Sequence, residues 1–128
     1  MPNIPLKKIM LVEDEPDIQT IVKMALEAKG FILEVCSSGS EALQKVSRFS
    51  PDLILLDMMM PEMDGITTLK ELRKIPRSSN IPVIFLTAKV QKKEIEQYKK
   101  LGAIDVITKP FDPMALGSVL QEIWNKVS

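Results

Sequence analysis

The chain has 128 residues, of which 45% are apolar and 27% charged, and its 17 Lys and Arg balance its 17 Asp and Glu. This length and apolar content fit one compact domain with a single core. The chain has no histidine, which excludes histidine-dependent hydrolases, His-ligated metal sites and a histidine phosphodonor within the chain. Zero net charge provides no general attraction to nucleic acid or anionic lipid.

The single cysteine, Cys36, excludes an intramolecular disulfide and favours a reducing compartment. The N-terminal residues contain no apolar segment typical of a signal peptide, and no apolar run approaches the roughly 18 residues of a membrane span. We therefore expect a cytoplasmic protein that binds neither membranes nor nucleic acid.

The chain contains five short apolar runs, and each predicts a strand that is covered on both faces, as in parallel sheets. They lie at residues 9–12, 31–36, 53–56, 83–86 and 106–107. The segments between them show helical spacing. One apolar stripe is formed by Ile18, Ile21, Val22 and Ala25, and another by Leu116, Val119, Leu120, Ile123 and Val127.

Capping signals place the helix ends between these strands. Ser38 with Glu41 forms a capping-box pattern, and Asp112 before Pro113 is typical of a helix start. Strands alternating with helices predict a doubly wound α/β fold with a five-stranded parallel sheet and five helices. We expect a single domain over residues 1–128, with residues 1–7 as a short leader and no output domain.

Polar residues follow four of the predicted strands, and parallel strands would bring them to one edge of the sheet. They are Glu13, Asp14, Asp57, Thr87 and Lys109. Three crowded carboxylates are hard oxygen ligands whose repulsion a divalent cation relieves, so the pattern predicts a Mg²⁺ site. Calcium is less favoured because the chain lacks the loop in which one segment supplies most ligands.

Asp57 ends an otherwise apolar strand, where a rigidly held carboxylate can attack phosphorus. Phosphoryl transfer depends on positioning and on neutralising the charge of the phosphoryl oxygens. A metal ion, the Lys109 ammonium and the Thr87 hydroxyl would supply both. The strand-end residues therefore point to a phosphoryl acceptor.

Four segments together resemble the receiver domain of two-component response regulators over essentially the whole chain. They are Glu13-Asp14, the stretch DMMMPEMDG at 57–65, Leu86-Thr87-Ala88 and Lys109-Pro110-Phe111. The resemblance implies the flavodoxin-like strand order 2-1-3-4-5. It also implies a phosphoprotein that catalyses only its own phosphorylation and dephosphorylation.

The resemblance assigns a role to each matching residue. Asp57 would accept the phosphoryl group, while Glu13, Asp14, Asp57 and the Met59 backbone carbonyl would hold Mg²⁺. Lys109 would pair with the phosphoryl group, Thr87 would turn its hydroxyl toward it, and the Lys109-Pro110 bond would be cis.

The resemblance also implies the partners. The donor would be a sensor histidine kinase or a histidine phosphotransfer protein, and the output would be contact with a downstream protein target. Homodimerisation on phosphorylation stays open, as do the cognate kinase and the pathway.

Two positions bear on how the signal leaves the site and how long it lasts. Val106 stands where many receivers have an aromatic switch residue, so Val106 would act with Thr87 only by filling space, and loop and helix displacement would transmit the signal. Met59 and Lys89 would flank the path of water to the phosphoryl group. An apolar Met59 predicts slow self-dephosphorylation.

Several other residues are explained by structure and need no role in chemistry. The methionines Met58, Met59, Met60 and Met63 favour packing over a soft-metal site, and Asp64-Gly65 favours a turn and helix start. Tyr98 and Trp124 fit core packing or a partner-facing surface. The pairs Lys92-Lys93 and Lys99-Lys100 fit a solvated face.

Three alternatives to a stand-alone receiver remain. The chain could be a phosphorylation-independent interaction module, although intact Asp57, Thr87 and Lys109 argue against it. It could be a fragment of a transcription factor or hybrid kinase. A Mg²⁺-dependent phosphohydrolase would need a general acid at the position of Met59, where none stands.

Overall fold

The computed structural model describes residues 4–88 and 91–127, and it forms one five-stranded parallel sheet with the order β2-β1-β3-β4-β5. The strands are β1 (Lys8–Val12), β2 (Ile32–Cys36), β3 (Leu53–Asp57), β4 (Val83–Thr87) and β5 (Asp105–Thr108). The predicted fold class and strand order are confirmed. Residues 1–3 of the expected leader, and Lys89, lie outside the described residues.

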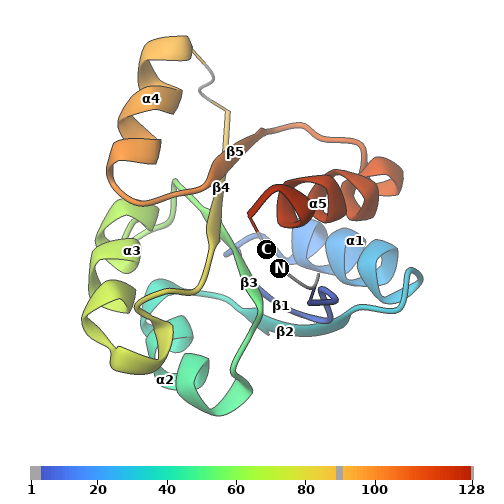
Figure 1. The fold of residues 1–128 in the computed structure, drawn as a ribbon, viewed down its shortest axis with the longest axis horizontal. Coiled ribbons are helices and arrows are strands. Elements are labelled where there is room, and N and C mark those ends of the chain that lie inside the picture. The colour runs from blue at the N-terminus through green and yellow to red at the C-terminus, as the bar shows by residue number, and fades with distance from the viewer. Residues whose placement is uncertain (1–3, 89–90, 128) are drawn as a thin grey trace.

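Five helices cover the two faces of the sheet. They are α1 (Pro16–Glu27), α2 (Gly39–Phe49), α3 (Gly65–Lys74), α4 (Lys92–Lys100) and α5 (Pro113–Val127), with a turn of 3-10 helix at Pro76–Ser78. Figure 1 shows α1 and α5 together on one side and α2, α3 and α4 on the other. This three-layer arrangement follows from right-handed crossovers between parallel strands.

The core consists of two apolar clusters, one on each face of the sheet. The cluster beneath α1 and α5 includes Leu26 and Leu120, and the cluster beneath α2, α3 and α4 includes Leu69 and Phe85. All residues of β3 and β4 are buried, which explains why these strands appear as continuous apolar runs in the sequence.

Side-chain caps begin two of the helices as the sequence predicts. The Ser38 hydroxyl accepts a hydrogen bond from the Glu41 backbone N–H at 3.1 Å, and the Asp64 carboxylate accepts one from the Thr67 N–H at 2.8 Å. Each cap satisfies a backbone donor that the helix leaves unpaired. The Asp64 cap fixes the start of α3 directly after the loop that follows β3.

The apolar stripes of α1 and α5 are rotated from their predicted positions. On α1 the fully buried residues are Val22 and Leu26, whereas Ile21 is 47% exposed. On α5, Leu116, Leu120 and Trp124 are buried, while Val119 and Val127 are exposed. Because the two helices pack against each other as well as on the sheet, their buried faces differ from those that spacing alone indicates.

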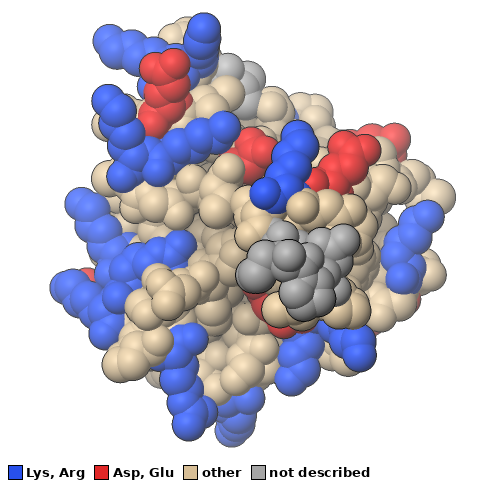
Figure 2. Space-filling model, in the orientation of Figure 1, with Lys and Arg blue, Asp and Glu red and all other residues tan. Residues whose placement is uncertain are grey.

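Charge is unevenly distributed on this net-neutral chain. Figure 2 shows Lys and Arg side chains gathered on the side formed by α3 and α4, where Lys92, Lys93, Lys99 and Lys100 are all exposed, as predicted for a solvated face. Within the described ranges, none of the helices has the length and apolar character needed to cross a membrane.

Candidate functional site

The strand-end polar residues converge at the carboxyl edge of the sheet. Glu13 follows β1, Asp57 and Thr87 end β3 and β4, and Lys109 follows β5. Glu13, Asp57 and Thr87 are at most 2% exposed. Because β1, β3 and β4 are neighbours in the sheet, residues that are far apart in the chain meet in one small volume.

Glu13 is completely buried, and both its backbone and its carboxylate have polar partners. Its backbone N–H donates to the Cys36 carbonyl at 2.9 Å, and its carbonyl accepts from the Gln19 side chain at 2.6 Å. Its carboxylate accepts from the Glu15 N–H at 3.1 Å and lies 2.7 Å from Lys109 Nζ. A buried carboxylate with these partners has little freedom to reorient.

Asp57 is the second buried carboxylate of the site. Its Oδ1 lies 3.2 Å from Lys109 Nζ and accepts a hydrogen bond from the Met59 backbone N–H at 3.2 Å. The Met58 N–H continues the sheet by donating to the Leu86 carbonyl at 2.9 Å. The strand therefore holds the Asp57 carboxylate rigidly beside the lysine.

The positive charge of Lys109 faces both buried carboxylates of the site, and the pKa values of all three groups are shifted. Burial raises the pKa of Glu13 to about 7, against the lowering effect of its bonds to Lys109 and to the Glu15 N–H. Burial also raises the pKa of Asp57. Burial lowers the pKa of Lys109, but the hydrogen bonds and the negative charges of Glu13 and Asp57 together raise it overall.

The acids are close enough to share one cation. Glu13, Asp14 and Asp57 each offer a carboxylate oxygen, and these three oxygens lie within 4.8 Å of one another. With Lys109 included, the ionised groups have a net charge of about −2, which a divalent cation would offset. Hard carboxylate donors suit Mg²⁺, so the residues present fit the acidic cluster typical of a receiver magnesium site.

The other predicted site residues surround this cluster. The Met59 side chain is 71% exposed beside Asp57. The Lys109 backbone N–H donates to the Thr87 carbonyl at 2.9 Å, and the Lys109-Pro110 peptide bond is cis. Val106 is half-buried, is paired with Phe85 in the β4–β5 register, and packs against the cluster beneath α2, α3 and α4.

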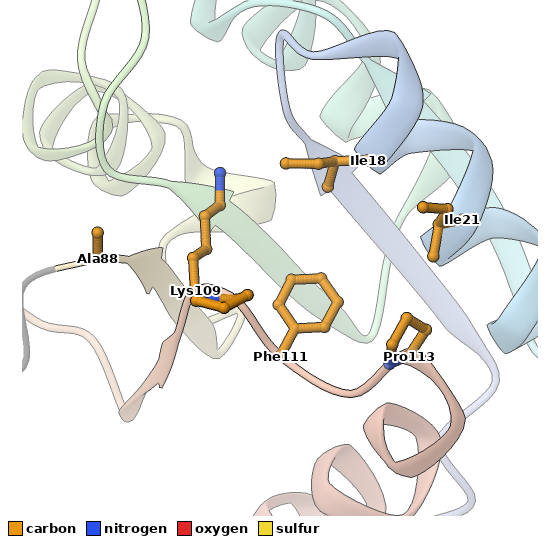
Figure 3. Close-up of a pocket in the computed structure, with 7 residues that line it drawn as sticks. Ile18, Ile21, Ala88, Lys109, Phe111 and Pro113 are labelled. Carbon is orange, nitrogen blue, oxygen red and sulfur yellow. The ribbon is translucent and has the colours of Figure 1, made fainter.

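An apolar pocket of about 450 Å³ opens next to the acidic cluster. Figure 3 shows Lys109 at its edge, with Ile18 and Ile21 of α1 facing Phe111 and Pro113. Ala88 and Pro110 complete the lining. Its walls come mainly from α1 and from the segment between β5 and α5.

Sequence reasoning missed one contact at the site, in which the Gln19 side chain of α1 donates a hydrogen bond to the Glu13 carbonyl at 2.6 Å. The spacing of Gln19 on α1 resembles that of any surface polar residue, so the sequence carried no signal for this contact.

Comparison with known proteins identifies the family. Residues 9–121 match the response regulator receiver domain. The chain is 39% identical over 120 residues to the alkaline phosphatase synthesis transcriptional regulatory protein PhoP of Bacillus subtilis, covering 94% of this chain and 49% of that protein. It is 41% identical over 121 residues to the transcriptional regulatory protein CpxR homolog of Haemophilus influenzae, covering 94% and 52%.

Solved structures give the same result. The chemotaxis response regulator CheY4 of Vibrio cholerae is 29% identical with a TM-score of 0.86, covering 93% of this chain and 99% of that one. A signal receiver domain of a histidine kinase from Syntrophus aciditrophicus is 35% identical with a TM-score of 0.81, covering 95% and 92%. The chain spans about half the length of the curated transcriptional regulators PhoP and CpxR homolog. It belongs to the response regulator receiver domain family of two-component signalling.

Proposed function

We propose that this receiver accepts a phosphoryl group on Asp57 from a phosphohistidine of a partner protein, and signals by phosphorylation-dependent contact with a target protein. The observation that supports it most is the pairing of the buried Asp57 carboxylate with Lys109 Nζ at 3.2 Å, inside a group of three carboxylates. A buried acid at a strand end has a rigid position, and Lys109 supplies a cation beside it, as a phosphoryl acceptor requires.

The site residues divide the work of the transfer. The carboxylates of Glu13, Asp14 and Asp57, with the Met59 backbone carbonyl, would hold Mg²⁺, which when bound neutralises charge on the phosphoryl oxygens. Lys109 would neutralise a further oxygen, and the Thr87 hydroxyl would donate to another after transfer. Asp57 keeps one oxygen for attack on phosphorus.

The transfer itself conserves atoms and charge. An Asp57 carboxylate oxygen forms a bond to the donor phosphorus while the bond from phosphorus to the partner's imidazole nitrogen breaks. The imidazole leaves with the electron pair and takes a proton from solvent. Later hydrolysis of the aspartyl phosphate returns phosphate and the free carboxylate, so the chain turns over no external substrate.

The likeness to sensor-linked proteins supports a sensor histidine kinase or a histidine phosphotransfer protein as donor. The apolar pocket beside Lys109 offers side chains that a donor surface can contact, among them Ile21, which is 47% exposed. We further propose that the protein acts in the cytoplasm through a protein target, without binding nucleic acid or membrane. Phosphorylation-driven homodimerisation is a second form that this contact could take.

The test is phosphorylation by acetyl phosphate, followed by intact mass spectrometry. Wild-type protein with Mg²⁺ should gain one phosphoryl group, and the gain should disappear in EDTA. The variants Asp57→Asn and Asp57→Ala should gain none, because both lack the carboxylate that attacks phosphorus. The first keeps the size of the side chain and the second removes it. A neighbouring control, Asp64→Asn, alters a carboxylate that caps α3 and should still be phosphorylated.

A phosphoryl group found on any residue other than Asp57 would overturn the assignment of the acceptor. The absence of any mass gain together with an absence of Mg²⁺ binding would favour a phosphorylation-independent interaction module. An Mg²⁺-dependent release of phosphate from small phosphomonoesters, with multiple turnovers, would favour a phosphohydrolase instead.

A further inference from the structure

Gln19 on α1 reaches the loop that carries two of the acids of the site. Its side-chain amide nitrogen donates a hydrogen bond to the Glu13 backbone carbonyl at 2.6 Å. Its backbone N–H donates to the Glu15 carbonyl at 3.0 Å, at the start of α1. One helical residue therefore contacts the loop from Glu13 to Glu15 twice, once with its main chain and once with its side chain.

The side-chain bond of Gln19 fixes the peptide group that joins Glu13 to Asp14. The Glu13 carbonyl belongs to this planar unit, so its orientation constrains the dihedral angles on both sides and with them the directions of the two acidic side chains. At its other end, the Glu13 backbone N–H donates to the Cys36 carbonyl at 2.9 Å. Hydrogen bonds thus hold the backbone before and after the buried Glu13 carboxylate.

Asp14 depends most on this backbone. It is only half-buried, yet one of its carboxylate oxygens lies within 4.8 Å of an oxygen of Glu13 and an oxygen of Asp57. Packing confines a buried carboxylate, whereas a partly exposed one is free to turn away from two like charges unless its backbone directs it toward them. The orientation of the peptide group between Glu13 and Asp14 therefore controls how closely the three oxygens can surround one cation.

The second hydrogen of the Gln19 amide connects it to another element. The amide nitrogen donates to the Ser37 hydroxyl oxygen at 3.1 Å, in the loop between β2 and α2. Because the Glu13 carbonyl only accepts, the nitrogen of the amide and not its oxygen faces it. Ser37 is itself held, since its backbone N–H donates to the Glu41 carboxylate at 2.9 Å. The Gln19 amide is thereby fixed between the end of β1 and the first turn of α2.

We propose that Gln19 is a positioning residue that sets the preference of the acidic cluster for Mg²⁺ over larger divalent cations. Mg²⁺ requires near-ideal octahedral geometry with ligands at about 2.0–2.1 Å, whereas Ca²⁺ accepts more ligands at longer and more variable distances. Carboxylates that are held in place favour the stricter ion. Gln19 acts through the backbone between Glu13 and Asp14 and binds no ion itself. The inference rests on the proposed magnesium site.

The test compares wild type and Gln19→Met in their affinities for Mg²⁺ and for Ca²⁺, each measured from the shift of the urea unfolding midpoint with metal concentration. Methionine has a similar length and helix propensity but no hydrogen-bond donor. Gln19→Met should bind Mg²⁺ about two- to tenfold more weakly, the effect of one lost hydrogen bond. Its affinity for Ca²⁺ should fall less, so the ratio of the Mg²⁺ affinity to the Ca²⁺ affinity should drop.

An unchanged Mg²⁺ affinity, or an equal loss for both ions, would overturn the proposal. A purely structural role of Gln19 would lower the stability of the metal-free protein and leave the affinity ratio unchanged.

Thr20→Val is the matched control. The Thr20 hydroxyl also donates to a backbone carbonyl, that of Pro16 at 3.0 Å, but this exposed bond lies within α1 and not at the acidic loop. Its removal should leave both metal affinities unchanged. A drop of the affinity ratio in Thr20→Val as large as in Gln19→Met would assign the effect to α1 in general and contradict the inference.

Ser37→Ala tests the link to the second loop. The alanine keeps the backbone bond to Glu41 but removes the oxygen that holds the Gln19 amide. It should weaken Mg²⁺ binding in the wild-type background and have no effect in Gln19→Met, because Ser37 acts through Gln19. Equal effects in both backgrounds would contradict this. A wild type that binds no Mg²⁺ refutes the metal site itself, whereas Mg²⁺ bound equally well by wild type and Gln19→Met refutes only the role of Gln19.

Discussion

Lys109 Nζ lies 2.7 Å from the Glu13 carboxylate, which is completely buried, and this ion pair links the end of β5 to the end of β1. The same ammonium lies 3.2 Å from Asp57. One cation thus serves two buried acids, and the affinity of the site for further positive charge follows from this imbalance.

Replacing Lys109 by Ala should destabilise the metal-free protein by about 3 kcal/mol, near the lower end for a broken buried pair because the lysine keeps some solvent contact. Urea unfolding in EDTA measures this loss. Phosphorylation by acetyl phosphate should also slow. Lys45→Ala is the matched control. The ion pairs of Lys45 with Glu34 and Glu41 lie at the surface, so this variant should lose much less stability than Lys109→Ala.

The raised pKa of Glu13 predicts how stability depends on pH without metal. Between pH 4.5, the ordinary pKa of a glutamate, and about pH 7, the raised pKa of Glu13, the unfolded chain releases the proton that the folded protein keeps. The folded state then binds more protons, so the free energy of unfolding falls as pH rises through this window. Asp57, whose pKa is also raised, acts in the same direction.

Urea unfolding at several pH values in EDTA, for wild type and Glu13→Gln, checks this dependence. The variant should lack the Glu13 contribution and show a flatter profile between pH 4.5 and 7. Saturating Mg²⁺ should stabilise wild type more at pH 8 than at pH 5, since the metal competes with protons for the carboxylates. A wild-type stability that rises through this window relative to Glu13→Gln would contradict the prediction.

The sequence predicted the sheet, its order and the strand ends well because buried parallel strands appear as uninterrupted apolar runs, such as residues 53–56, and because the family resemblance covers the whole chain. Contacts between elements were harder. Ile21 fits the apolar spacing of α1 yet is 47% exposed, because the α1–α5 contact decides which side of α1 is buried. The contact between the Tyr98 and Phe85 rings joins α4 to β4, and spacing within either element does not reveal it.

Met59 bears on the lifetime of the phosphorylated state. Its side chain is 71% exposed beside Asp57 and offers no hydrogen bond to an approaching water. Met59→Asn should shorten the half-life of the aspartyl phosphate about fivefold, the effect of one hydrogen bond near 1 kcal/mol on the attacking water. The decay is followed by intact mass after removal of acetyl phosphate.

Met59→Leu provides the control for that experiment, because it keeps an apolar side chain of similar size and should leave the half-life unchanged. Equal half-lives of wild type and Met59→Asn would remove Met59 from any part in controlling hydrolysis.

Gly65 is the residue at which α3 approaches the acceptor strand most closely. A Cβ atom there would lie 2.6 Å from the Asp57 carbonyl oxygen and 2.9 Å from the Met58 Cα, both of them backbone atoms that cannot rotate away. Gly65→Ala should therefore cost about 1–3 kcal/mol in stability. It should also slow phosphorylation by displacing the Asp57 backbone.

Gly117 of α5 supplies the matched substitution. Its added Cβ would lie 3.2 Å from the Cγ of Lys29, a flexible side chain that can move. Alanine in a helix interior is favoured over glycine by up to about 1 kcal/mol, so Gly117→Ala should be neutral or stabilising and leave phosphorylation unchanged. If Gly65→Ala were as stable and as readily phosphorylated as Gly117→Ala, the close approach of α3 would have no part in positioning Asp57.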